Sequence, residues 1–305
     1  MAVYRILSID GGGIRGIIST ILLQRLSAEP SLSGWLEKVD LLAGTSTGGL
    51  LALGIAKPLN LQVIRDLYET KGEIIFYDSW LRCGPGKIIE AKYDITNLEI
   101  ELQAILGTTT LSQLSKKVLI TAFDLDGVDP QGQRTWKPKL FHNFPGPGSD
   151  GNQLAYKVGV YTAAAPTYFP SADGYVDGGV FASNPAMCAL AQTQDPRIGD
   201  RSALTDVVLF SLGTGTSLTY ITGERHNWGY IQWVKPLIDL MLDGVAGIAD
   251  YQCKQLLDRA YHRLAPVFPP PMNIPMDGVD QVPEMIDFAG KVDLGPTIQW
   301  LKKYW

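Results

Sequence analysis

The stretch from Leu41 to Leu50, LLAGTSTGGL, decides the fold, because an apolar run enters a glycine-flanked serine and a second apolar run leaves it. This pattern predicts a strand, a tight turn and a helix. The order G-x-S-x-G fits a nucleophile elbow, in which flanking glycines leave room for a sharp turn that presents one hydroxyl, here that of Ser46. Ordinary turns use the same residue types, so the pentapeptide alone leaves a catalytic serine and a structural turn equally open.

A second unit of the same kind precedes this one. Val3 to Ile9 is a short, mostly apolar segment that ends at Asp10 and three glycines, and isoleucines and leucines then recur at helical spacing as far as Pro30. Val39 to Ala43 supplies the next strand. Two successive strand–loop–helix units predict an α/β fold with parallel strands.

The composition bounds the class of protein. The chain has 305 residues, 46% of them hydrophobic, which is enough for a substantial core. A formal net charge of −5 argues against a nucleic-acid-binding surface. The three cysteines, Cys83, Cys188 and Cys253, are widely scattered, so neither a disulfide framework nor a metal cluster is expected, and a reducing compartment is the simplest interpretation.

Membrane insertion is not predicted. The N-terminal residues run directly into a strand and lack a basic region followed by a longer apolar core, so no signal peptide is expected. No uninterrupted apolar run reaches the roughly 18 residues of a spanning helix, and any contact with lipid would be peripheral. The apolar segment from Ile231 to Ile248, interrupted by Pro236, is interpreted as a buried helix in preference to an acyl-binding or lipid-contacting one.

The other segments alternate between strands and helices. Strands are expected at Val118–Phe123, Lys139–Phe141, Tyr175–Val176 and Val207–Leu212, with a polar turn at Asp126–Pro130. Helices are expected at Gln153–Ala164, at Pro185–Gln194 with Asn184 as cap, and between 60 and 107 with Asn60 and Asp94 as N-caps, Gly107 as a stop and a break at Cys83–Gly86. After Pro266 a proline-rich tail holds one amphipathic segment, Ile298–Trp305.

The glycine loop from Gly11 to Gly16 matches G-x-G-x-x-G, the pattern of dinucleotide-binding loops. Such a site wants an acidic residue at the end of the second strand, about 20 residues further on. The chain has a helix end and a loop there, at 29–34, which disfavours a nucleotide. A loop of amides opening a helix still suits an anion, either as an oxyanion hole or as a plain tight turn, and Arg15 beside it would hold a phosphate or carboxylate or orient the loop.

A nucleophilic serine needs a base. The three histidines, His142, His226 and His262, stand in unrelated contexts, none of which resembles a catalytic-histidine loop. A Ser-His-Asp triad is therefore doubtful, and the base is expected to be a carboxylate or a lysine. Asp177 follows a short strand and precedes two glycines, which is the pattern of an Asp-Gly turn or of a site at the carboxyl end of a strand.

Five segments together resemble the patatin-like phospholipase family. They are Asp10–Gly16 (DGGGIRG), Gly44–Gly49 (GTSTGG), Ala163–Pro170, Asp177–Gly179 (DGG) and Ser211–Gly215. The first, second and fourth match the three signatures of the family in order and placement. The resemblance runs from Ile6 to about Gly215, and the joint occurrence of the motifs makes it specific.

The resemblance implies roles for individual residues. Ser46 corresponds to the nucleophile and Asp177 to its base, in a Ser-Asp dyad that needs no histidine. Gly11, Gly12 and Gly13 correspond to the oxyanion hole, with the second and third as the best candidates for donors. The enzymes of this family hydrolyse acyl esters of phospholipids and other lipids without a metal, and no cofactor is expected.

The resemblance also implies a three-layer α/β/α sandwich with a mainly parallel sheet. The whole chain, 1–305, is predicted to form a single domain, with the core motifs in 6–215 and a helical, proline-rich C-terminal part in 216–305. The expected protein is cytoplasmic, with a lipid or phospholipid substrate and peripheral contact with membranes. A transacylase using the same dyad and a non-catalytic storage or binding protein are the alternatives; intact motifs weigh against the second.

Overall fold

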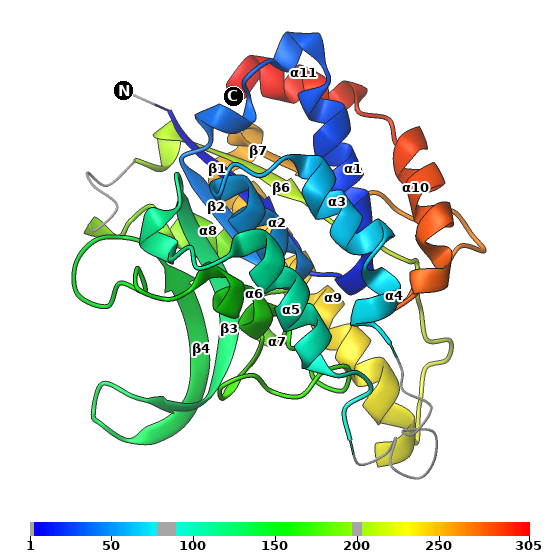
Figure 1. Ribbon diagram of the computed structural model, residues 1–305. Coiled ribbons are helices and arrows are strands. Elements are labelled where there is room, and N and C mark those ends of the chain that lie inside the picture. The colour runs from blue at the N-terminus through cyan, green and yellow to red at the C-terminus, as the bar shows by residue number, and fades with distance from the viewer. Residues whose placement is uncertain (1–2, 78–89, 197–202) are drawn as a thin grey trace.

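The computed structural model describes residues 3–77, 90–196 and 203–305. Within these residues the chain forms a seven-stranded sheet with helices on both faces (Figure 1). Its strands are β1 (Tyr4–Ile9), β2 (Leu41–Thr45), β3 (Lys117–Val128), β4 (Arg134–His142), β5 (Tyr175–Asp177), β6 (Val207–Leu212) and β7 (Tyr261–Leu264). Cys83 and the break expected at Cys83–Gly86 lie outside the described residues.

The sheet is mainly parallel. The strand order is β4-β3-β2-β1-β6-β7, in which β3, β2, β1, β6 and β7 run in the same direction, whereas β4 and β5 pair with β3 in the antiparallel sense. The central strands β1, β2 and β6 are apolar on both faces because helices cover both faces. Parallel strands also place their carboxyl ends, and the loops that follow them, at one edge of the sheet.

Alternate residues of the strands divide the core in two. Leu7 and Leu42 belong to one apolar cluster, and Ile6 and Leu41, their neighbours in sequence, belong to the other. The first cluster packs under α1 (Gly16–Ser27), α2 (Thr47–Ala56), α3 (Leu61–Glu69), α4 (Gly72–Ile75), α5 (Ile95–Leu106), α6 (Ala155–Ala163), α10 (Val282–Lys291) and α11 (Gly295–Tyr304). The second packs under α8 (Ala186–Gln192) and α9 (Tyr230–Leu257), near the short α7 (Gly179–Ala182). This confirms the predicted three-layer α/β/α sandwich.

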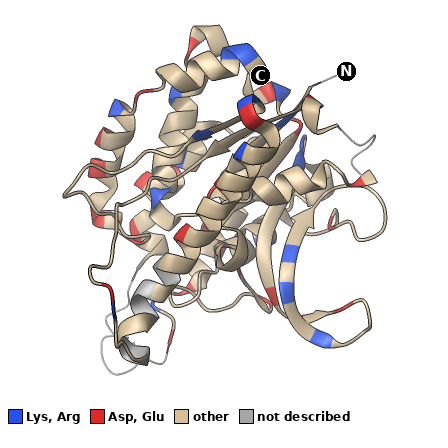
Figure 2. Cartoon of the chain, turned by 180° about the vertical axis from the view of Figure 1, so that it is seen from behind, with Lys and Arg blue, Asp and Glu red and all other residues tan. Residues whose placement is uncertain are grey.

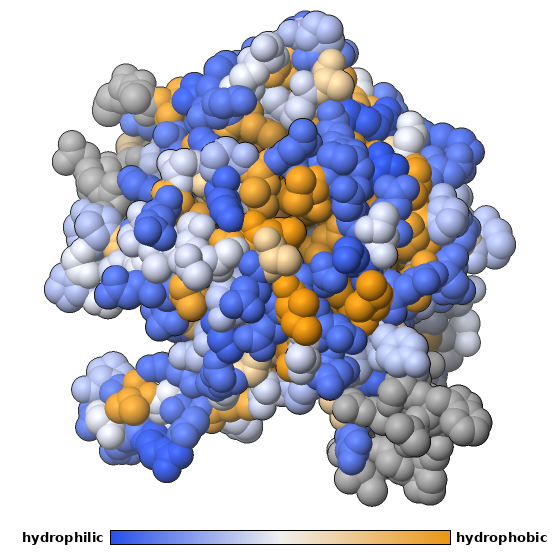
Figure 3. All heavy atoms as spheres, in the orientation of Figure 1, coloured by the Kyte–Doolittle hydropathy of each residue, from blue (hydrophilic) through white to orange (hydrophobic). Residues whose placement is uncertain are grey.

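The helix boundaries follow the predicted caps. The side chains of Asn60 and Asp94 accept hydrogen bonds from the backbone N–H two residues further on, at 2.8 and 2.9 Å, and so begin α3 and α5. Gly107 ends α5 with φ of +60°. Between these helices apolar side chains reach the surface (Figure 3), and Val63, Ile74 and Ile100 are 38%, 46% and 57% exposed.

The hairpin of β3 and β4 is longer than predicted. Residues 126–128, expected in a polar turn, continue β3 beyond a bulge, and the turn itself lies at 129–133. Asp129 closes this turn, since its carboxylate accepts from the backbone N–H groups of Gln131 and Gln133. The hairpin extends past the helices (Figure 1), so its polar residues meet water on both faces. Backbone pairing between β3 and β4, and not a pattern of apolar residues, therefore forms this part of the strand.

The C-terminal part contributes to the core and contains elements that the sequence did not predict. The strand β7 extends the sheet by pairing with β6, with Leu209 opposite Tyr261, and α10 packs against α1. Because these residues share the sheet of the N-terminal motifs, we propose that 1–305 is a single domain. The expectation of a helical, proline-rich C-terminal part therefore missed one strand, β7.

Helix α9 corrects two expectations. It lies across the back of the sheet (Figure 2) and continues through Pro236, where the sequence suggested an interruption. Within the segment Ile231–Ile248, Leu240, Met241 and Ile248 are 49%, 50% and 52% exposed, so the prediction of a buried helix was wrong at these positions, and α9 is buried further on, at Ala249 and Cys253. No helix among the described residues is long and apolar enough to cross a membrane.

An ion pair between a buried carboxylate and a partly buried arginine joins the two parts of the chain. Arg263, on β7, donates from Nη2 to Oδ2 of Asp10 at 2.6 Å and from Nη1 to Ser211 Oγ at 2.7 Å. Burial raises the pKa of the Asp10 carboxyl, and the guanidinium opposes this rise. Asp10 lies between β1 and the glycine loop, so the pair fixes the point at which that loop begins.

Removing one partner of this pair should be costly. In Arg263→Met the Asp10 carboxyl keeps its burial without its cation, and the free energy of unfolding should fall by about 3–5 kcal/mol. Urea denaturation measures this loss, and Asp10→Asn combined with Arg263→Met should restore most of it. Arg259→Met is the matched control, because its ion pair with Asp258 is more than four-fifths exposed and should be worth less than about 1 kcal/mol. Equal stability of the two arginine variants would contradict this account.

Candidate active site

Ser46 occupies the sharp turn between β2 and α2. Its backbone has φ of +53° and ψ of −127°, a conformation that a residue with a side chain rarely adopts and that costs of order 1–3 kcal/mol. The surroundings hold it there. The Ser46 N–H donates to Thr162 Oγ1 of α6 at 2.8 Å, and a Cβ atom on Gly48 would lie 2.1 Å from the carbonyl oxygen of Ile9.

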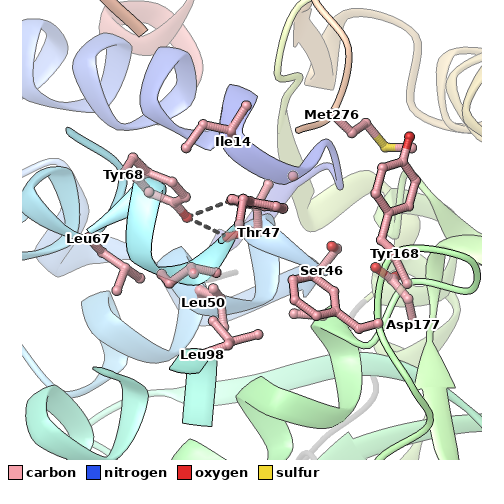
Figure 4. A pocket seen from close by; sticks show the side chains of 17 residues that line it. Ile14, Ser46, Thr47, Leu50, Leu67, Tyr68, Leu98, Tyr168, Asp177 and Met276 are labelled. Carbon is pink, nitrogen blue, oxygen red and sulfur yellow. Dashed lines mark hydrogen bonds between the residues drawn. The ribbon is translucent and has the colours of Figure 1, made fainter. Parts of the chain in front are cut away.

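Hydrogen bonds also fix the two neighbours of Ser46. Thr45 Oγ1 donates to the carbonyl oxygen of Ala182 at 2.6 Å and lies 2.7 Å from Thr121 Oγ1. On the other side, Thr47 Oγ1 donates to the hydroxyl of Tyr68 at 2.5 Å (Figure 4). The backbone that carries the Ser46 hydroxyl is thus tied to β3, α3, α6 and α7.

Asp177 is the last residue of β5 and lies beside Ser46 (Figure 4). Its Oδ1 accepts from the backbone N–H of Gly179 at 2.7 Å. Burial raises the pKa of this carboxyl to about 6, and hydrogen bonding from the Ser46 hydroxyl and the Gly179 N–H offsets part of the effect. Gly178 permits the close approach of β5 to β3, since a Cβ there would lie 2.1 Å from Thr121 Oγ1.

The glycine loop passes next to Ser46. A Cβ atom on Gly11 would be 3.4 Å from that of Ser46. The N–H of Gly11 donates to the carbonyl oxygen of Ser183 at 2.9 Å, whereas no described residue accepts from the N–H of Gly12 or Gly13. Side chains are excluded at both of these positions, because a Cβ on Gly12 would lie 2.2 Å from Thr214 Oγ1 and one on Gly13 would lie 2.1 Å from the carbonyl oxygen of Met276.

Arg15 lies where the loop becomes helix α1. Its Nε donates to the carbonyl oxygen of Gly12 at 3.3 Å, and the residue also lines a pocket that contains Ser46. Of the two roles expected for Arg15, binding an anion and orienting the loop, this geometry supports the second.

The three histidines lie elsewhere. His142 stacks on Phe144, His262 stacks between Phe210 and Trp300, and His226 packs against Trp228 in a loop. None of them lines either of the two pockets that contain Ser46 and Asp177. Within the described residues, the side chain that the chain brings to Ser46 as a candidate base is therefore a carboxylate.

Two pockets meet at Ser46 and Asp177. One is almost entirely apolar and runs between α2, α3, α4 and α5 (Figure 4), with an empty space of about 600 Å³ that includes its open mouth. The other lies between the glycine loop and α9 and is lined by Arg15 and Asp243 as well as by apolar groups. Both lie at the carboxyl edge of the parallel strands, where α/β sheets bind their ligands.

Several residues that shape the site were not identified from the sequence. Thr162 and Tyr68 support the elbow from helices far away in sequence, and Met276 crosses the glycine loop, accepting from the N–H of Ile14 at 2.8 Å. Nothing local marks these positions. Thr214 lies within the Ser211–Gly215 motif, and its Oγ1 donates to the carbonyl oxygen of Gly11 at 2.8 Å.

A serine on a strand–turn–helix elbow at the edge of a mainly parallel α/β sheet fits a nucleophile elbow. The match of residues 7–190 to the model of the patatin-like phospholipase family is more specific. The chain belongs to the patatin-like phospholipase family.

Two patatins of Solanum tuberosum and a bacterial phospholipase agree with this assignment. Patatin group M-3 of Solanum tuberosum is 32% identical over 81% of this chain and 70% of its own, and the probable inactive patatin-3-Kuras 1 of the same species is 31% identical over 81% and 72%. A cGAMP-activated phospholipase of Pseudomonas aeruginosa is 28% identical over 92% of this chain and 83% of its own. Among solved structures, VipD from Legionella pneumophila has a TM-score of 0.40 and 12% identity, over 95% of this chain and 67% of that one.

The raised pKa of Asp177 predicts a pH-dependent cost in stability. Below about pH 3 the carboxyl is protonated in both the folded and the unfolded chain, so its burial costs nothing extra. Above about pH 6 the carboxyl is ionised in both states, and because its pKa is higher in the folded chain than in the unfolded one, ionisation destabilises the folded state by about 3 kcal/mol. Asp177→Asn should therefore be more stable than the native protein at pH 8, by up to this amount, and equally stable near pH 3.

Thermal or urea unfolding at the two pH values measures this difference. Asp173→Asn is the control, because Asp173 is largely exposed and its pKa is lowered by Tyr161 and Lys157. Its substitution should give no stabilisation at pH 8. An Asp177→Asn protein that is no more stable than the native one at pH 8 would contradict the assigned burial cost.

Proposed function

We propose that the protein is a lipid acyl hydrolase that uses Ser46 as nucleophile and Asp177 as general base. The observation that carries this proposal is the position of the Ser46 hydroxyl, on a strained elbow beside a buried carboxyl with a pKa of about 6, where two pockets meet. Membership of the patatin-like phospholipase family and the phospholipase named among its relatives support the substrate class.

In the proposed reaction Asp177 takes the hydroxyl proton as Ser46 Oγ attacks the carbonyl carbon of an ester. The carbonyl π bond opens and negative charge develops on its oxygen. As this intermediate collapses, the bond to the alcohol breaks, the alcohol leaves with the proton, and the acyl group stays on Ser46. Water then attacks this acyl-enzyme, again with Asp177 as base, and releases the fatty acid.

The pKa of Asp177 suits this task. A base works best when its pKa lies close to the working pH, because it is then ionised yet still holds a proton well. An exposed aspartate is too weak a base, and burial in an apolar site corrects this. Ionisation above about pH 6 should make the reaction rate rise with pH across that value.

We assign the oxyanion donors to the N–H groups of Gly12 and Gly13. Both are without an acceptor among the described residues, and Gly11 instead anchors the loop through Ser183. Preorganised donors of this kind meet charge only as it develops, and the loss of one typically costs about a hundredfold or more in rate. Arg15 orients the loop through the carbonyl oxygen of Gly12.

We further propose a cytoplasmic protein that contacts membranes peripherally. The pocket beside the glycine loop adjoins the exposed part of α9, where Met241 both lines the pocket and is half exposed. Phospholipids in a bilayer could then reach Ser46 from this side. Cys188 and Cys253 are both free thiols, which agrees with a reducing compartment.

The direct test is hydrolysis of a panel of phospholipids, lysophospholipids and acylglycerols, with products identified by mass spectrometry. The native protein should release fatty acid and the matching lysolipid or alcohol, and Ser46→Ala and Asp177→Asn should each lose activity by a factor of about a thousand or more. An added alcohol such as glycerol reports transfer instead of hydrolysis through the formation of new esters.

Single replacement of His142, His226 or His262 by Ala or Asn provides the control. Each of these proteins should retain substantial activity, because no histidine lines either pocket. Loss of activity with any one of them, at unchanged stability, would support a Ser-His-Asp triad and contradict the Ser-Asp dyad. A native protein without activity on any lipid of the panel would support the non-catalytic alternative, to which the relative named as probably inactive is a precedent.

A further inference from the structure

The two pockets at Ser46 differ in chemistry, and this difference determines how an ester would lie. Resting on the proposed acyl hydrolysis, we propose that the apolar pocket binds the acyl chain of the substrate as a single extended chain, with Leu98 of α5 as the residue that limits its length. The leaving alcohol, with its polar head group, then lies in the pocket beside the glycine loop.

The walls of the apolar pocket support an acyl chain. Ile14, Leu50, Leu67, Ile75 and Leu98 are each at least nine-tenths buried and still border empty space. An apolar cavity of this kind costs stability, because its lining atoms lack partners on one side. Asp177 is the ionisable carboxylate of this pocket, and it lies at the end where the ester would react. The pocket therefore favours a hydrocarbon and disfavours a charged group.

The direction of the chain follows from the arrangement of these side chains. Ser46 and Asp177 lie at one side of the pocket, whereas Leu67 and Leu98 lie at the opposite side (Figure 4). An acyl group bonded to Ser46 Oγ would point away from the carboxyl and pass Leu50 on its way to Leu98. The last carbons of the chain would thus meet the side chain of Leu98.

One side wall is built from packed aromatic rings. Phe76 packs edge-on against Tyr93, with ring centroids 5.3 Å apart, and both contact Phe169 at 5.7 Å. Interlocked rings of this kind leave little freedom to widen the pocket. A straight chain fits such a wall better than a branched one.

The second pocket suits the other half of the substrate. Arg15, Asp243, Gly11 and Gly12 are among its lining residues, beside apolar ones, and it lies next to α9, where Met241 is half exposed. Charged and polar groups can remain hydrated there. A lipid would therefore place its head group in this pocket and its acyl chain under α5.

Leu102 provides a matched control one helical turn from Leu98. Both are buried leucines of α5, but Leu102 does not border the pocket and packs toward Gly159 of α6, where a Cβ atom would lie 3.2 Å from its Cδ1. Truncation of either residue removes the same atoms from the core. Only truncation of Leu98 should lengthen the space available to the chain.

The test uses p-nitrophenyl esters of straight-chain fatty acids of increasing length, and the quantity measured is the ratio of kcat/KM for long and short chains. Leu98→Ala should shift the preferred chain to greater length, and Leu98→Trp should lower this ratio by about tenfold or more, because one methylene without room is already worth about that much. Leu102→Ala should keep the ratio of the native protein. The two Leu98 variants act in opposite directions, so the test survives if the larger side chain prevents folding.

The outcomes separate the two proposals. If activity depends on Ser46 but Leu98→Ala, folded by circular dichroism, keeps the native chain-length profile, or if Leu102→Ala shifts it equally, the acyl-pocket proposal is overturned while the hydrolase remains. If ester hydrolysis persists in Ser46→Ala, the proposed function itself fails, whatever the profile. A shift with both Leu98 variants and none with Leu102→Ala supports the acyl pocket.

Discussion

The strained backbone of Ser46 is the constraint on which the rest of the site depends. A non-glycine residue holds positive φ only where its surroundings leave no alternative, and here β1, β2 and α2 approach so closely that Gly44 and Gly48 tolerate no Cβ. The hydrogen bond from the Ser46 N–H to Thr162 closes the turn from the side of α6. Strand order, helix packing and glycine positions thus combine to present one hydroxyl at the edge of the sheet.

The same packing sets the chemistry around that hydroxyl. Asp177 reaches Ser46 because β5 adds to β3 beyond the end of β2, in a place where the apolar core withholds water from the carboxyl. The site gains a stronger base and loses stability, which is a common exchange at functional sites. At the start of the glycine loop, the ion pair of Asp10 and Arg263 ties this loop to β7. The C-terminal strand therefore takes part in holding the loop beside Ser46.

Features of the fold that depend on local sequence patterns were predicted correctly. The strands that enter Asp10 and Ser46, the caps at Asn60 and Asp94, and the layered α/β fold follow from periodicity and turn chemistry. The sequence analysis missed β7, whose four residues, YHRL, show no apolar run because an edge strand packs mainly through one face. It also missed the partners of the elbow, Thr162 and Tyr68, since only tertiary packing brings them to Ser46. The prediction of a buried helix failed at Leu240 and Met241, because apolar content does not reveal which face has a partner.

The most direct measurement of the central claim is covalent labelling of the native protein with a fluorophosphonate, followed by mass spectrometry of the intact chain and of its peptides. A serine activated by Asp177 should give a single adduct on Ser46, with no adduct in Ser46→Ala and a much slower reaction in Asp177→Asn. A native protein that remains unlabelled, or a Ser46→Ala protein that is labelled equally well, would contradict the assignment of Ser46 as an activated nucleophile.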